Sequence, residues 1–133
     1  MSEIFEYSFR VCYADTDAGG VVYHGKYFDI CERARGEFLR SKGIIQTKLI
    51  DDYGVAFVVK SAKIDYKRPA KLDDLLRIET KVVENTGVVL KINQKIFDEN
   101  NEQKIELDIE VVCLNQSFHL TRIPKNIIEV LKN

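Results

Sequence analysis

The sequence predicts an α+β domain in which one long central helix packs against a curved antiparallel sheet of about five strands. Apolar residues recur at helical spacing in one long stretch, residues 27–40, with charged residues on the opposite side. Stretches before and after it alternate between apolar and polar residues, as half-buried strands do. No regular succession of strand and helix follows, so a parallel α/β sheet is not expected.

The chain length of 133 residues fits a single domain, residues 1–133, which is large enough to bury a core. Apolar residues make up 45% and charged residues 31% of the chain, a composition that excludes a disordered protein. The net charge is -1, so the composition does not indicate a nucleic acid or an anionic membrane as partner.

The first predicted element is a strand over residues 5–13. Its odd positions are apolar or aromatic, and its even positions near the start are polar. Residues 15–20 read Asp-Thr-Asp-Ala-Gly-Gly, which predicts a turn that ends the strand. The long helix then occupies residues 27–40, and Gly43 is suited to end it. A second, short helix is predicted over residues 47–53.

Extended structure follows the helices and ends in one more short helix. The alternation predicts strands over Val55–Tyr66 and over residues 75–83, 88–97 and 105–114, joined by hairpin-like turns. Pro124 predicts the start of a helix over residues 125–131. A single sheet of this kind has exposed edges, so we expect a dimer formed by extending the sheet.

The three cysteines, Cys12, Cys31 and Cys113, lie far apart within apolar patterns. This spacing predicts buried, reduced thiols and neither a disulfide framework nor a metal site. The N-terminus is acidic where a signal peptide would be basic, and no apolar stretch approaches the roughly 20 residues of a membrane span. We therefore expect a cytoplasmic protein.

Residues 13–27 contain most of the side chains that could take part in catalysis or ligand binding. Two aspartates and two glycines within six residues most simply form a turn whose carboxylates cap backbone amides. A calcium loop of the EF-hand type is disfavoured, because Lys26 stands where the bidentate glutamate is required. An aspartyl-phosphate loop is also disfavoured. Such loops follow a parallel strand that is buried on both faces, whereas residues 5–13 alternate between apolar and polar.

A third interpretation places Asp17 opposite the N-terminus of the long helix. Glycines after Asp17 allow close approach of a ligand, and residues 24–27 supply free amide groups. Such amides, aided by the helix dipole, would polarise a carbonyl oxygen while the carboxylate attacks the carbon or activates water. A thioester suits this arrangement, because its thiolate leaves without a strong general acid.

The same residues resemble a known family. The run Asp-Thr-Asp-Ala-Gly-Gly-Val-Val-Tyr-His at residues 15–24, followed by Tyr27 and Glu-Arg-Ala-Arg at 32–35, is similar to the 4-hydroxybenzoyl-CoA thioesterase family. Within that family it is closest to the subgroup of Tol-Pal-associated acyl-CoA thioesterases. Residues 57–59, 66–70 and 72–74 also look like this subgroup, so the resemblance covers nearly the whole chain.

The resemblance implies a hot-dog fold, a homodimer or homotetramer, and no metal or other cofactor. It implies hydrolysis of acyl-CoA, with acyl groups from short to long chain and acyl carrier protein thioesters as candidates. It also implies a link to the bacterial cell envelope, at the inner face of the membrane. A non-catalytic module that binds acyl thioesters or acyl carrier protein stays open as an alternative.

The resemblance also assigns roles to residues. Asp17 is similar to the catalytic carboxylate, as nucleophile or as general base, and His24 would orient water or the carbonyl group. The expected substrate-binding residues line the loop and the helix start, with one phosphate contact further along: Tyr13, Gly20, Val22, Tyr23, Gly25, Tyr27 and Arg68. The hairpin at residues 84–87, strongly basic in some relatives, holds no Lys or Arg here, which leaves the nucleotide contacts open.

A dehydratase or isomerase of the same fold would need a histidine paired with an acid from the central helix. Glu32 and Glu37 are acids on that helix, but the periodicity places both on its polar face. His119 has no neighbouring motif and is expected at the surface.

Overall fold

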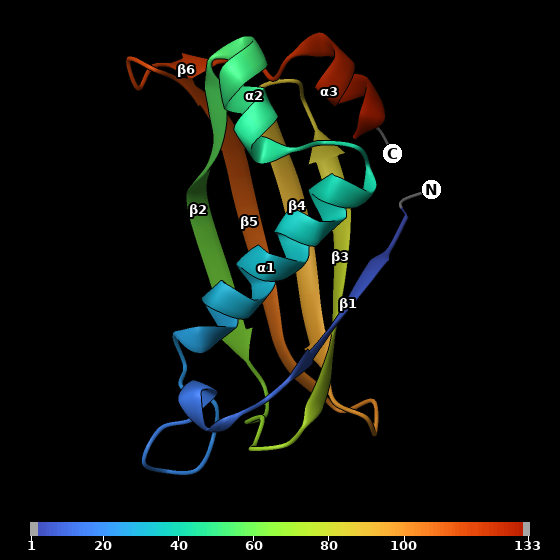
Figure 1. The fold of residues 1–133 in the computed structure, drawn as a ribbon. Helices are drawn as coiled ribbons and strands as arrows, with labels where there is room; N and C mark the ends of the chain where they lie inside the picture. The colour runs from blue at the N-terminus through green and yellow to red at the C-terminus, as the bar shows by residue number, and fades with distance from the viewer. Residues whose placement is uncertain (1–2, 132–133) are drawn as a thin grey trace.

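Residues 3–131 are described by the computed structural model, in which one long helix crosses one face of an antiparallel sheet (Figure 1). The sheet has 6 strands in the order β1-β3-β4-β5-β2, with β6 paired to β5. The strands are β1 (Phe5–Arg10), β2 (Val55–Tyr66), β3 (Leu75–Asn85), β4 (Val89–Phe97), β5 (Gln103–Asn115) and β6 (Leu120–Thr121). The helices are α1 (Lys26–Ser41), α2 (Gln46–Tyr53) and α3 (Lys125–Val130), with the single turn η1 at Tyr13–Asp15.

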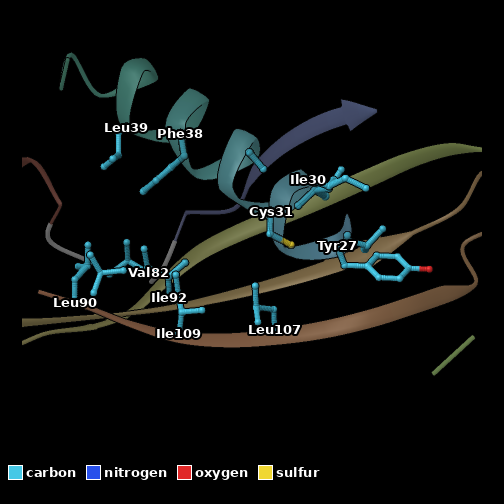
Figure 2. Packing of buried hydrophobic residues seen from close by; sticks show 14 of the residues in the cluster. Tyr27, Ile30, Cys31, Phe38, Leu39, Val82, Leu90, Ile92, Leu107 and Ile109 are labelled. Atoms are coloured by element: carbon cyan, nitrogen blue, oxygen red, sulfur yellow. The ribbon is translucent and has the colours of Figure 1, made fainter. Parts of the chain in front are cut away.

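The core lies between α1 and the sheet. Figure 2 shows Cys31 and Phe38 extending from α1 toward the sheet, where Ile92 and Leu107 point back at them. All four side chains are buried. The helical and alternating patterns in the sequence therefore correspond to the two sides of one core, and the predicted α+β architecture is confirmed.

Three details differ from the sequence prediction. The first strand ends at Arg10, because the backbone N-H of Cys12 donates to the Asp15 carboxylate at 2.9 Å and the chain then turns through η1. β6 was not predicted; it has only two residues, too few to show an alternating pattern. Cys31 and Cys113 are buried free thiols as expected, but the prediction that Cys12 is buried is wrong, since it is exposed in the segment that follows β1.

A buried polar network lies beneath the middle of α1. Gln94 on β4 is fully buried, and its amide nitrogen donates to the carbonyl oxygen of Cys31 and the hydroxyl of Thr80, both at 2.9 Å. Its amide oxygen accepts a hydrogen bond from the Arg35 guanidinium at 2.9 Å. The network joins α1 to β3 and β4 by polar contacts within an otherwise apolar core.

Candidate active site

The loop between η1 and α1 folds back on itself at Asp17. Thr16 and Val22 form an antiparallel bridge, and the backbone N-H of Asp17 donates to the carbonyl of Val21 at 2.9 Å. Gly20 adopts a φ of 78°, in the left-handed region that favours glycine. This residue therefore closes the turn with little backbone strain. The predicted turn over residues 15–20 is confirmed.

Asp17 lies at the tip of this loop with an exposed side chain. Its Oδ1 accepts a hydrogen bond from the N-H of Gly19 at 2.8 Å, and its second carboxylate oxygen has no hydrogen-bond partner among residues 3–131. The arrangement is the capped turn that aspartates commonly form. In the isolated chain, Asp17 therefore has one oxygen held in place and the other turned to solvent.

Asp15, in contrast, is buried, with 3% of its surface exposed. Its Oδ2 accepts the N-H of Cys12 at 2.9 Å, and its Oδ1 lies 3.2 Å from Nζ of Lys26. Burial alone would raise the pKa of the Asp15 carboxyl, but hydrogen bonds from Cys12 and the Lys26 ammonium outweigh it. The net effect lowers the pKa below its ordinary value of 3.8.

This pKa shift predicts a stability contribution that depends on pH. Because the folded-state pKa of Asp15 is lower than the unfolded one, its charge stabilises the fold above the unfolded pKa. That stabilisation is lost as the pH falls through the folded-state pKa. In urea denaturation we expect the midpoint of the wild type to exceed that of Asp15→Asn at neutral pH, and the difference to shrink below about pH 4. A difference that persists unchanged to about pH 2 would contradict this prediction.

The start of α1 offers fewer free amides than the sequence suggested. The N-H of Tyr23 donates to the Asp15 carbonyl at 2.9 Å, and the N-H of Lys26 donates to the Tyr23 carbonyl at 2.8 Å. The expectation of free amides throughout residues 24–27 is therefore wrong for Lys26. The N-H groups of His24, Gly25 and Tyr27 have no acceptor within the described part of the chain. Tyr27 is buried, whereas His24 and Gly25 are exposed or half-buried, so the latter two are the donors open to a ligand.

A side chain at Gly25 would displace the Tyr23 ring from its observed position. The φ of -76 and ψ of -18 at Gly25 suit any residue, but a Cβ at this position would lie 2.8 Å from the Tyr23 ring. That ring in turn packs against the His24 ring, with centroids 4.4 Å apart. The glycine thus lets the Tyr23 side chain lie over the backbone at the helix start.

A hollow of about 310 Å³ adjoins these amides at the N-terminal end of α1. The Tyr66 hydroxyl, on β2, donates to the His24 carbonyl at 2.9 Å, and the buried Tyr27 hydroxyl accepts the N-H of Ala70 at 3.1 Å. These two contacts tie the helix start to the end of β2 and the segment after it. The hollow is lined by Val22, His24, Tyr27, Tyr66, Lys67, Arg68 and Pro69.

The structure brings together four of the residues expected at the site, namely Val22, His24, Tyr27 and Arg68. Tyr23 and Gly25 adjoin them at the helix start, whereas Asp17 and Gly20 lie on the loop outside the lining. Tyr13 is 81% exposed on η1, so the isolated chain gives no support for its expected role in lining the site.

Two basic residues, Lys67 and Arg122, were not singled out from the sequence, and only Lys67 lies at the hollow. Lys67 lines the hollow next to Arg68, and its Nζ lies 3.4 Å from an exposed Asp65 carboxylate. Arg122 lies against the hairpin at residues 84–87, where its guanidinium is 2.7 Å from the position of a Cβ on Gly87. Arg122 is far from Gly87 in the sequence, so no local sequence pattern indicates that the two residues lie together.

Other expectations concern the rest of the surface. Glu32 and Glu37 are exposed on the polar face of α1, as the periodicity predicted, and His119 is exposed. A larger hollow of about 480 Å³ beside α1 is lined mostly by charged and polar residues, these two glutamates among them, together with Ile44 and Ile45, and does not include His24. Within residues 3–131, no three His, Cys, Asp or Glu side chains are grouped to hold a metal ion. No helix in this range is long and apolar enough to cross a membrane.

Comparisons with known proteins identify the family. Residues 19–105 match the thioesterase superfamily. The acyl-CoA thioester hydrolase YbgC of Escherichia coli is 40% identical over 130 residues, covering 97% of this chain and 96% of the relative. The acyl-CoA thioesterase YbgC of Haemophilus influenzae is 43% identical over 111 residues, covering 84% of this chain and 81% of the relative.

A solved structure agrees with these relatives. A probable thioesterase from Bartonella henselae superposes with a TM-score of 0.86 at 33% identity, covering 92% of this chain and 100% of the other. The helix and the antiparallel sheet thus form the hot-dog fold that the resemblance implied. The match to the superfamily begins two residues after Asp17 and spans the helix, most of the sheet and the hollow. The chain belongs to the thioesterase superfamily.

Proposed function

We propose that this protein hydrolyses acyl-CoA thioesters to the free acid and coenzyme A. The observation that carries the proposal is the 40% identity to an acyl-CoA thioester hydrolase across 97% of the chain. The open N-H groups of His24 and Gly25 beside a hollow support it, because they suit the carbonyl oxygen of a thioester.

The chemistry assigns separate tasks to the loop and the helix. The amides of His24 and Gly25 would polarise the thioester carbonyl, and the helix dipole would stabilise the negative charge that forms on its oxygen. Asp17 would either attack the carbonyl carbon, giving an anhydride that water cleaves, or take a proton from an attacking water. In both routes the C-S bond breaks and the coenzyme A thiolate leaves. His24 would orient the water or the carbonyl group.

The exposed position of Asp17 favours a site completed by a second copy of the chain. A carboxylate facing bulk water is a weak nucleophile or base compared with one in a desolvated site. The edge strand β2 has 12 residues, pairs with β5 on one side only, and exposes Val58 and Val59. Pairing of two β2 strands would extend the sheet and bring a second chain beside the hollow.

A charged residue introduced on the exposed edge strand β2 tests this assembly. In sedimentation at low micromolar concentration we expect the wild type to be a dimer or tetramer, with no large monomer fraction. Val59→Lys, at a position 44% exposed on β2, should shift it toward monomer because it places a charge on the edge strand that a second copy would cover. Val130→Lys, at a position 42% exposed on α3, is the matched control and should leave assembly unchanged. A wild type that is an active monomer would contradict the proposed dimer.

Lys67 and Arg68 are candidate contacts for the coenzyme A phosphates, since both line the hollow. Acyl groups from short to long chain and acyl carrier protein thioesters are candidate substrates. The subgroup resemblance further suggests a homotetramer in the cytoplasm, associated with the Tol-Pal envelope system at the inner membrane.

The proposed reaction is tested by mixing the protein with a panel of short-, medium- and long-chain acyl-CoAs. Release of free thiol and of free acid in equal amounts is the expected result. Tight binding of acyl-CoA without thiol release would overturn the proposal in favour of a non-catalytic acyl-thioester binding module.

A further inference from the structure

Lys26 is a cation at the first residue of α1, where the helix dipole disfavours positive charge. Its side chain is held in place by two carboxylates. Nζ lies 3.2 Å from Oδ1 of Asp15 and 2.8 Å from Oδ2 of Asp29. The pair with Asp29 is a partly exposed contact within one helix turn, of a kind that contributes little. The pair with Asp15 differs, because the Asp15 side chain is only 4% exposed.

Asp15 joins both ends of the loop that carries Asp17. Its carboxylate accepts the N-H of Cys12, where the loop begins, and its carbonyl accepts the N-H of Tyr23, where the loop ends. Lys26 adds the third connection, from this buried junction to α1. The Asp15 junction, formed by Cys12, Asp15, Tyr23 and Lys26, is therefore the point at which the loop is attached to the helix.

The proposed reaction depends on the geometry across this junction. Asp17 lies on the loop, whereas the open amides of His24 and Gly25 lie directly between Tyr23 and Lys26. A shift of the loop relative to the helix would change the approach of the carboxylate to the carbonyl carbon. Displacements of about 1 Å in such geometries can lower a rate by about 10²-fold.

We propose that Lys26 is a positioning residue for the hydrolysis, which holds the Asp17 loop against the start of α1 through Asp15. The inference rests on the proposed thioesterase function. It assigns Lys26 no contact with the substrate, so its loss should affect turnover more than binding.

The decisive comparison is between Lys26→Met, Lys26→Arg and Arg33→Met. Lys26→Met should lower kcat about 10-fold and leave KM within about twofold, because the transition-state geometry suffers while ground-state binding is kept. Lys26→Arg keeps a cation within reach of Asp15 and should restore most of kcat. Arg33→Met removes the other cation that pairs with Asp29, at 3.1 Å, and should change neither constant. Unchanged kcat in Lys26→Met, or equal loss in Arg33→Met, would overturn the inference.

Hydrogen exchange supplies a readout independent of activity. In Lys26→Met the N-H groups of Cys12 and Tyr23 should exchange faster than in the wild type, with the amides in the middle of α1 unchanged. Equal protection in both proteins would overturn the positioning role. If the wild type released no thiol from any acyl-CoA, the proposed function would fail, and the exchange rates would still decide whether Lys26 holds the loop. Should Lys26→Met not fold, Lys26→Gln takes its place.

Discussion

Replacing Asp17 by asparagine should lower kcat for acyl-CoA hydrolysis by about 10² to 10⁴-fold, the range expected for loss of a general base or nucleophile. The amide is nearly the same size as the carboxylate, and its oxygen can still accept the N-H of Gly19, which holds the turn at 2.8 Å. The variant should therefore keep its fold. What it loses is the negative charge needed to attack the carbonyl carbon or to activate water.

The matched control for this variant is Asp73→Asn. Asp73 is an exposed aspartate on another loop, and its φ of 72 is well tolerated by asparagine. Thiol release measured under saturating acyl-CoA should be unchanged in this control. Equal rates for Asp17→Asn and the wild type would remove Asp17 from the proposed mechanism while leaving the family and the fold intact.

The largest expected effect on stability is that of Gln94→Leu. Leucine fits the space of the glutamine but leaves the half-buried Arg35 guanidinium and the Thr80 hydroxyl without this partner, while the Cys31 carbonyl keeps only its bond within the helix. The free energy of unfolding should fall by about 3 kcal/mol, because buried polar groups left unpaired keep their full desolvation cost. Urea denaturation followed by circular dichroism measures this loss.

A double variant tests the physical reason for that loss. Gln94→Leu leaves the Arg35 guanidinium unpaired, and adding Arg35→Met removes that unpaired cation. The double variant should therefore be about 1 kcal/mol more stable than Gln94→Leu alone. If the two substitutions are simply additive, the hydrogen bond between Arg35 and Gln94 at 2.9 Å does not couple the helix to the sheet.

The fold was largely predictable because periodicity reports burial. Leu76, Ile78 and Thr80 alternate along β3 and are all buried, as the period of two requires. The long helix was predicted at residues 27–40 and occupies Lys26–Ser41. The errors fell where a side chain competes with backbone pairing. Asp15 captures the N-H of Cys12 and ends β1 early, which no alternation pattern can show.

The site was predictable only in part, since its contacts join residues far apart in sequence. Val22, His24 and Tyr27 are close together in the sequence and line the same hollow, as the local motif suggested. The role of Tyr66 in bonding the His24 carbonyl depends on how β2 ends beside α1, a tertiary relation. The exposure of Asp17 likewise depends on where the loop after η1 lies relative to the rest of the fold, which a local sequence pattern does not describe.

The most direct test of the account is a structure of the protein with an acyl-CoA analogue in which a ketone replaces the thioester. The account predicts the ketone oxygen at about 3 Å from the N-H of His24 or Gly25, with the Asp17 carboxylate facing the carbonyl carbon from the other side. A ketone bound away from those amides, or out of reach of every Asp17 carboxylate in the assembly, would contradict the proposed mechanism.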